Sequence, residues 1–351
     1  MPAPPPKKHP WQGGSLASPR TPCPWGLGPA LLAVLLLGSV LLLGSAANAA
    51  TEDEPAPPPE PERFSLQTLP DGVDLAAWYY ASPAEDGPLA TVLLVHDLGG
   101  SHAALEPLAL ALQAGGCAVV APDLRGHGES PLERLKGAAG DGDQSKLLKR
   151  NDFMAMAATT GGRLRAQSAV RGDLECVRNW LKQRADSGEL DLEKFYLVGS
   201  GLGAAVASTW TIADAAWPPV ASGPQGGDVR GLVLIEPSLV TRGFSMSRLL
   251  PLEPLRTNLP VMILSTGTSR DAQKVFDQFK RSRPSDWFDN REKKSPAKDT
   301  EASLFFLAIP ARGPGGRELS ADQFAALRSA DPRRLDPAAA ILTFIRATAD
   351  R

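Results

Sequence analysis

One stretch of the 351-residue chain, Phe195 to Ala213, passes from a strand-like apolar run into a helix of small residues through closely spaced glycines. The glycines are Gly199, Gly201 and Gly203. Glycine accepts backbone conformations that other residues avoid and lets two backbones approach closely. The spacing therefore predicts a strand over 195–199, a sharp turn that has no side chain at Gly201, and a helix over 202–213.

The rest of the chain repeats this alternation of strand and helix. An opening hairpin is predicted over 63–69 and 73–81, joined at Pro70-Asp71-Gly72. Further apolar runs predict strands over 91–96, 118–122, 194–199, 231–235, 260–265 and 303–309. Helices are predicted over 103–114, 171–184, 202–213, 271–281 and 337–348. This order is typical of an α/β domain with a mainly parallel sheet covered on both faces.

The N-terminal residues do not belong to this domain. No charged residue occurs between Arg20 and Glu52, and Leu27 to Ala47 is almost wholly apolar. Basic residues precede the apolar run and acidic residues follow it, so the positive-inside rule predicts that the chain after residue 50 is extracytoplasmic. The domain would be periplasmic, secreted or membrane-anchored.

The apolar run has two interpretations. Ala47-Asn48-Ala49 has the pattern of a signal-peptidase site. The run is also long enough to span a bilayer, which takes about 20 residues. The expected organisation is a basic, Pro-rich region over 1–26, a signal peptide or transmembrane anchor over 27–49, an acidic Pro-rich linker over 50–62, and a folded domain over 63–351 with a candidate lid at 131–170.

Composition excludes several function classes. The net charge is −2 and the folded part has no basic block, so nucleic acid is not an expected partner. The cysteines, Cys23, Cys117 and Cys176, have no spacing that supports a disulfide, and the latter two are expected to be small buried residues. The four histidines, His9, His96, His102 and His127, have no Cys or His partner at metal-ligand spacing. We therefore expect neither a metal nor a cofactor.

Two motifs identify a family when they are taken with the glycine turn. Val92 to Gly100 reads VLLVHDLGG, and Ala121 to Ser130 reads APDLRGHGES. In this order they resemble the α/β-hydrolase superfamily, most closely its branch of serine aminopeptidases, monoacylglycerol lipases and general esterases. The resemblance covers about residues 63–350 and implies an α/β-hydrolase fold with about eight strands. The segment 239–259 is short, so no large cap domain is expected.

The resemblance fails at the nucleophile. The family carries G-x-S-x-G at this turn, and here the central position is Gly201. Ser200 cannot take its place, because that register would need glycines at positions 198 and 202. By the same resemblance, the backbone N–H groups of Leu98 and Leu202 would form the oxyanion hole and could still bind an oxygen atom. The alternative is that both amides only begin helices.

The base and the acid of the family's triad are also in doubt. The loop after the last strand, Ile309 to Glu318, contains no histidine, and none occurs after His127. Arginine cannot act as the base because its guanidinium stays protonated. Asp271 is a weak candidate for the former acid, and its alternative role is to begin the helix over 272–281. His96, His102 and His127 fall at positions that we interpret as structural.

These residues favour a non-catalytic protein of the cell envelope that binds a small ligand or a protein partner. Its pocket would lie at the carboxyl ends of the strands, lined by Asp97, Leu98, Gly201 and Leu202. One alternative is a divergent serine hydrolase of the esterase, lipase or aminopeptidase type. Another is an envelope scaffold that contacts proteins through its charged segments 131–170 and 282–301. If the N-terminal segment is not cleaved, the membrane is a further partner.

Overall fold

The structure is a computed structural model that describes residues 57–349, with gaps at 70, 140–142, 158–171, 218–220, 222–225, 258, 293, 296, 298–300 and 332. The chain divides into residues 1–54 and a compact unit of residues 55–351. The first unit, with the predicted signal or anchor, lies outside the described residues, as does Pro70 of the predicted hairpin turn. Within the described residues, no helix has the length and apolar character that crossing a membrane requires.

Nine strands form one sheet in the order β1-β2-β4-β3-β5-β6-β9-β11-β10. They are β1 (Glu62–Gln67), β2 (Asp74–Tyr80), β3 (Thr91–Val95), β4 (Ala118–Pro122), β5 (Phe195–Ser200), β6 (Val229–Ile235), β9 (Val261–Ser265), β10 (Trp287–Asp289) and β11 (Leu304–Ala308). Pairings β1–β2 and β2–β4 are antiparallel, and all the others are parallel. The predicted mainly parallel sheet is confirmed, with one strand more than expected.

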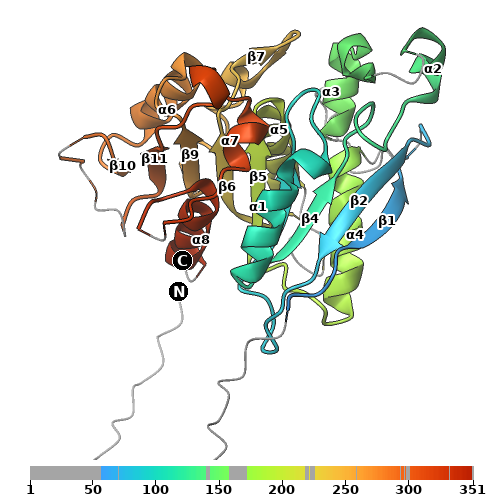
Figure 1. Cartoon of the computed structure of the whole chain (residues 1–351), viewed down its shortest axis with the longest axis horizontal. Helices are drawn as coiled ribbons and strands as arrows, with labels where there is room; N and C mark the ends of the chain where they lie inside the picture. Colours follow the sequence, from blue (N-terminus) through green and yellow to red (C-terminus); the bar gives the residue numbers. More distant parts are fainter. Residues whose placement is uncertain are drawn as a thin grey trace, which may run out of the picture. The chain divides into compact units, whose positions relative to one another are not determined.

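Helices cover both faces of this sheet (Figure 1). One face packs against α1 (His102–Ala114), α7 (Ala321–Ala325) and α8 (Pro337–Thr348) in a single apolar cluster. The other face packs against α3 (Arg150–Met156), α4 (Asp173–Asp186), α5 (Leu202–Ala215) and α6 (Arg270–Ser282) in a second cluster. Both clusters are continuous because the central strands are buried on both faces.

The carboxyl ends of the central strands meet at one edge of the sheet. In the parallel register Val95 lies opposite Gly199, and Ser200 lies opposite Ile235. Ile235 in turn lies opposite Leu264. The loops that follow β3, β5, β6 and β9 therefore lie side by side, which is where ligand sites of open α/β sheets are found.

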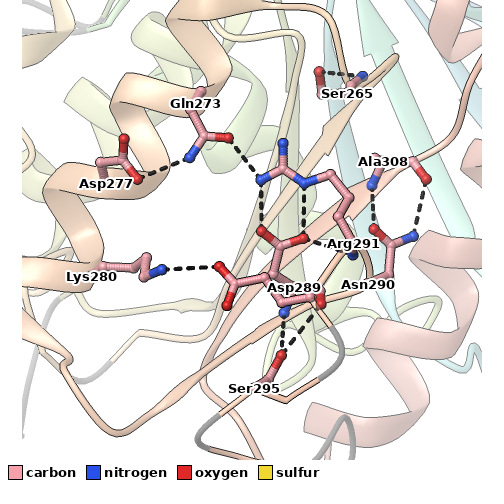
Figure 2. A network of polar contacts seen from close by, with 11 residues as sticks. Ser265, Gln273, Asp277, Lys280, Asp289, Asn290, Arg291, Ser295 and Ala308 are labelled. Atoms are coloured by element: carbon pink, nitrogen blue, oxygen red, sulfur yellow. Dashed lines mark hydrogen bonds and ion pairs between the residues drawn. The ribbon is translucent and has the colours of Figure 1, made fainter.

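The ninth strand, β10, lies within the charged segment 282–301, where no strand was predicted from the sequence. Trp287 of β10 is 8% exposed and packs edge-on against Phe276 of α6. Figure 2 shows how the strand is held at its end, where the Arg291 guanidinium lies against the Asp289 carboxylate, with N–O distances of 2.9 and 2.6 Å. The Asn290 amide group pairs with both backbone groups of Ala308, at 2.8 and 3.0 Å. A tryptophan inside a charged segment was the sequence signal for this strand.

The candidate lid region contains three short helical elements in its described part. These are α2 (Glu133–Ala139), the 3-10 helix η1 (Gln144–Leu147) and α3. In its described part, the segment 239–259 holds the short hairpin β7 (Val240–Thr241) and β8 (Phe244–Ser245), followed by the 3-10 helix η2 (Met246–Arg248). The described residues therefore contain no large cap domain.

A buried carboxyl in α5 gives a prediction about stability. Asp214 is 3% exposed, and its Oδ2 accepts hydrogen bonds from the backbone N–H groups of Gly227 and Asp228, each at 2.9 Å. Burial, and then the nearby Asp228 carboxylate, raises the pKa of Asp214 to about 6. Because the folded state binds this proton more tightly than the unfolded chain does, its contribution to stability is full at low pH and is lost as the pH rises through about 6.

Replacing Asp214 by Asn keeps an acceptor oxygen and removes the titrating charge. We expect Asp214→Asn to raise the free energy of unfolding at pH 8 by about 1–3 kcal/mol, with little effect near pH 4. Urea unfolding at the two pH values measures this, with Asp186→Asn as a control at an exposed position of α4. An equal effect at both pH values would contradict the role of the buried charge.

Candidate functional site

The turn between β5 and α5 has the geometry of a strained strand-to-helix elbow. Gly201 has φ 52° and ψ −111°, and its N–H donates to the carbonyl of Ile235 at 2.9 Å. The helix begins close to the sheet, because a Cβ on Gly203 would stand 2.2 Å from the carbonyl oxygen of Val95. The structure thus places Gly201 at the tip of the elbow, where a positive φ is tolerated best by glycine.

The two amides suggested as oxyanion donors point at the same atom of the protein itself. The N–H groups of Leu98 and Leu202 both donate to Oδ1 of Asp97, each at 2.7 Å. A carboxylate oxygen therefore occupies the place that the oxygen of a reacting carbonyl would take. Burial, and to a lesser extent the nearby Asp322, raises the pKa of Asp97, while the two amide bonds lower it in part. A free oxyanion hole is not present in this arrangement.

The Asp97 side chain also fills the space in front of the elbow. A Cβ built on Gly201 would stand 2.1 Å from both Cγ and Oδ1 of Asp97. No pair of non-bonded heavy atoms approaches so closely without a shift of one of them. The absence of a side chain at Gly201 and the position of the Asp97 carboxylate are therefore two parts of one arrangement.

A second carboxyl, which sequence reasoning missed, holds Asp97 from the other side. Asp322 lies in the first turn of α7 and is 4% exposed. Its two oxygens lie 3.0 and 3.2 Å from the backbone N–H of Asp97. Burial raises the pKa of Asp322, and the Ser200 hydroxyl lowers it in part. Ser200 itself is 1% exposed, and its hydroxyl has no hydrogen-bond partner of good geometry in the described residues.

The open side of the site is a cavity of about 250 Å³. Asp97 lines it from the loop after β3, Glu236 from the end of β6, and Arg312 and Glu318 from the loop after β11. Glu236 has a positive φ of 42°, and its Oε1 accepts from the N–H of Thr266 at 2.5 Å. The remainder of the wall consists of four serine and threonine residues and four apolar residues, Pro237, Ala311, Leu319 and Ala321, so the cavity is mixed in character and its charged lining residues are three carboxylates and one cation.

Asp271 does not line this cavity. It lies in the first turn of α6, where its Oδ2 accepts from the N–H of Leu239 at 3.1 Å. The helix is capped by Ser269, whose hydroxyl accepts from the N–H of Ala272. A carboxylate in the first turn of a helix interacts favourably with the helix dipole.

Two histidines near the site make their hydrogen bonds outside the cavity. Nδ1 of His96 lies 2.7 Å from the carbonyl of Asp97, and its Nε2 accepts from the N–H of Leu124. Since a carbonyl only accepts, the proton is on Nδ1, and burial lowers the pKa of this imidazole. His102 contacts the buried Asp123 carboxylate, which also accepts the backbone N–H of His102. Neither ring lines the cavity.

The structure also bears on metals and disulfides. Among the residues it describes, no group of three side chains of the metal-ligating types lies together. Cys117 and Cys176 are both buried, and burial raises the pKa of the Cys117 thiol to about 12. The thiol of Cys176 donates to the carbonyl of Gln67 at 3.6 Å.

Residues 92–351 match the model of the alpha/beta hydrolase family. No curated protein matches the chain.

Solved structures with a similar chain path include three hydrolases. A carboxyl esterase from Bacillus coagulans, solved in complex with glycerol, is 19% identical with a TM-score of 0.34, and the match covers 51% of this chain and 44% of that one. An esterase from Pyrococcus furiosus is 15% identical, with a TM-score of 0.41 and coverages of 72% and 83%. A dienelactone hydrolase from Anabaena variabilis is 15% identical, with a TM-score of 0.44 and coverages of 76% and 94%. The chain thus spans less than half of the carboxyl esterase.

Proposed function

The chain belongs to the alpha/beta hydrolase family, and from that premise we propose that it is a non-catalytic member that binds a small polar ligand. The observation that carries the proposal is the position of Asp97, whose Oδ1 accepts the N–H groups of both Leu98 and Leu202. Acyl transfer in this family needs those donors for the oxygen of the transition state. In this chain they are already satisfied.

Two other requirements of serine catalysis, a nucleophile and a base, also support a non-catalytic role. The elbow carries Gly201 in place of a nucleophile, and the loop after β11 brings Arg312 to the cavity in place of a base. Ser200 is buried beside Asp322 and does not line the cavity. A hydroxyl without a base of suitable pKa is not an effective nucleophile.

The charges of the cavity indicate which ligands it would accept. Asp97, Glu236 and Glu318 contribute carboxylates, and Arg312 is the cation that lines it. Carboxylates accept hydrogen bonds and do not donate them. The site therefore favours a small compound that presents donors, above all an ammonium group, whereas the family's site receives an oxyanion. The cavity also favours ligand binding over the alternative of a pure scaffold.

A divergent hydrolase is the alternative that family membership itself supports. To test it, the full-length protein is exposed to a fluorophosphonate and its intact mass is then measured. An active serine esterase treated in parallel is the positive control. We expect no adduct, because no activated serine faces the cavity. A stoichiometric adduct on Ser200 or on any other serine would overturn the proposal and assign the protein to the hydrolases.

The ligand class has its own test by calorimetry with ethanolammonium and acetate. We expect the wild-type protein to bind ethanolammonium and not acetate, and Glu236→Gln to weaken ethanolammonium binding by about tenfold, which is about 1.4 kcal/mol. Glutamine keeps the oxygen that accepts from Thr266, so the variant removes only the charge. Glu106→Gln, at an exposed position of α1, serves as the control. Equal affinity of Glu236→Gln and Glu106→Gln for ethanolammonium would contradict the proposed site.

We also propose that the folded domain lies outside the cytoplasm, tethered or released according to the fate of residues 27–49. The support is the charge asymmetry around the apolar run. Protease treatment of intact cells that express the full chain tests the location. Degradation of the domain without lysis is expected, and complete protection of a membrane-bound form would contradict it.

A further inference from the structure

A further cavity lies on the face of the sheet that α3 and α5 cover. Its volume is about 410 Å³, within the usual range for small-molecule sites. It is lined by residues 150 and 154 of α3, by Thr209 of α5, by residues 243–245 of the β7–β8 hairpin and by residues 248–249. It shares no lining residue with the cavity of Asp97. The proposed function makes no use of it.

The charged residues that line this cavity are two arginines. Arg150 is the first residue of α3 and Arg248 is the last residue of η2, and both are exposed to solvent. Within the described part of the chain, neither guanidinium makes a hydrogen bond or an ion pair, and no carboxylate lines the cavity. Asp152, which is near Arg150 in sequence, is engaged by the Arg134 guanidinium and by the backbone N–H of Lys149. Two accessible positive charges therefore border one hollow without a negative charge to balance them.

The remainder of the lining combines apolar side chains with a hydroxyl group. Met154, Phe244 and Leu249 contribute the apolar part of the wall. The hydroxyl of Ser245 makes no capping bond to η2, so its proton can be donated to a ligand. A Cβ built on Gly243 would meet no atom within 4 Å, so the wall borders open space at this position. The cavity thus offers donors and positive charge next to an apolar surface.

The backbone segments that carry the two arginines are held in place by contacts outside the cavity. Phe244 of the hairpin packs against Phe153 of α3, with ring centroids 6.2 Å apart. The Arg242 guanidinium donates to the carbonyl groups of Ser145 and Lys146, at 2.9 and 2.5 Å, and so fastens the hairpin to η1. Because these walls are positioned before a ligand arrives, binding has to order little more than the arginine side chains.

We propose that this cavity binds a phosphate monoester whose organic group is small and apolar. A guanidinium group binds phosphate through paired N–H donors, which makes arginine well suited to this anion. A phosphate monoester carries a charge of about −1.5 to −2 near pH 7 and so balances both Arg150 and Arg248, whereas a carboxylate balances one of them. The organic group of the ester packs against Phe244 and Leu249.

The test is a calorimetric titration of the full-length protein with phenyl phosphate at low salt. We expect saturable binding of phenyl phosphate, binding of benzoate that is weaker by at least about tenfold, and no binding of phenol. Arg150→Gln and Arg248→Gln should each weaken the binding of phenyl phosphate at least about tenfold, or 1.4 kcal/mol, because each removes one of the two charges. Both side chains are exposed, so both variants are expected to fold, and urea unfolding of each one checks this.

Arg270→Gln is the matched control, because Arg270 is also the exposed first residue of a helix, α6, and does not line this cavity. Arg312→Gln tests whether the anion binds in the cavity of Asp97 instead. Both controls should leave the affinity for phenyl phosphate unchanged. Absence of binding, an equal loss in Arg270→Gln, or a loss in Arg312→Gln alone would overturn the proposed site. Binding of inorganic phosphate as tight as that of phenyl phosphate would overturn the assignment to an organic ester.

Discussion

Replacing Gly201 by serine is expected to leave the protein unreactive toward a fluorophosphonate and to lower its free energy of unfolding by about 2–4 kcal/mol. Two effects contribute. The positive φ of Gly201 is strained for any residue with a Cβ, and that Cβ would stand 2.1 Å from Cγ and Oδ1 of Asp97. Restoring the family's nucleophile therefore conflicts with the carboxylate that fills the site.

A second substitution separates the effect of the contact with Asp97 from the effect of the positive φ at Gly201. The double variant Asp97→Gly with Gly201→Ser removes the clash, and its free energy of unfolding should exceed the additive expectation by at least about 1 kcal/mol. Gly315→Ser is the control, since Gly315 also has a positive φ, of 68°, and a Cβ at that position would meet no atom within 4 Å. Urea unfolding measures the free energy of unfolding, and the intact mass after exposure to a fluorophosphonate measures labelling. A stable, labelled Gly201→Ser protein would show that Asp97 does not block the elbow.

The second large effect is expected from Asp97 alone. Asp97→Gly should release the N–H groups of Leu98 and Leu202 and so create a site for acetate that the wild-type protein lacks. Two bonds to a charged acceptor at about 1.5–3 kcal/mol each predict at least a tenfold gain in acetate affinity after the cost of binding is subtracted. The unfolding free energy should fall by about 1–3 kcal/mol, because two donors lose their acceptor.

Asp97→Asn provides the matched control for this gain. Asparagine keeps an oxygen for both amides, so it should not bind acetate. The folded state raises the pKa of Asp97, so ionisation of this carboxyl costs stability as the pH rises above its usual value. Asn does not ionise and should therefore destabilise less than Gly at pH 7. Calorimetry with acetate decides between the two variants. Equal acetate binding by the wild type and Asp97→Gly would show that the two amides are accessible without the substitution.

Much of the fold could be predicted because the central strands are continuous apolar runs. The runs at 91–96, 118–122 and 260–265 became β3, β4 and β9 with ends that differ by at most one residue. Burial on both faces of a parallel sheet leaves few positions for polar residues, which makes such strands easy to recognise. Strand β10 was missed because its three residues lie in a charged segment and depend on contacts made by Asp289 and Asn290.

The site was less predictable for a physical reason. The resemblance pointed to Gly201 and to the amides of Leu98 and Leu202, since backbone donors follow from the path of the chain. Which group fills those donors depends on a side-chain torsion of Asp97 and on Asp322, which lies 225 positions away in sequence. The local signal was an aspartate directly before Leu98, because an aspartate side chain can accept from a nearby backbone N–H.

The fit between Asp97 and Gly201 also links what these two positions can accept. A side chain at position 201 meets the Asp97 carboxylate unless that carboxylate moves. A change at position 97 empties this space and leaves the N–H groups of Leu98 and Leu202 without their acceptor. We therefore expect the residues at the two positions to covary among related sequences.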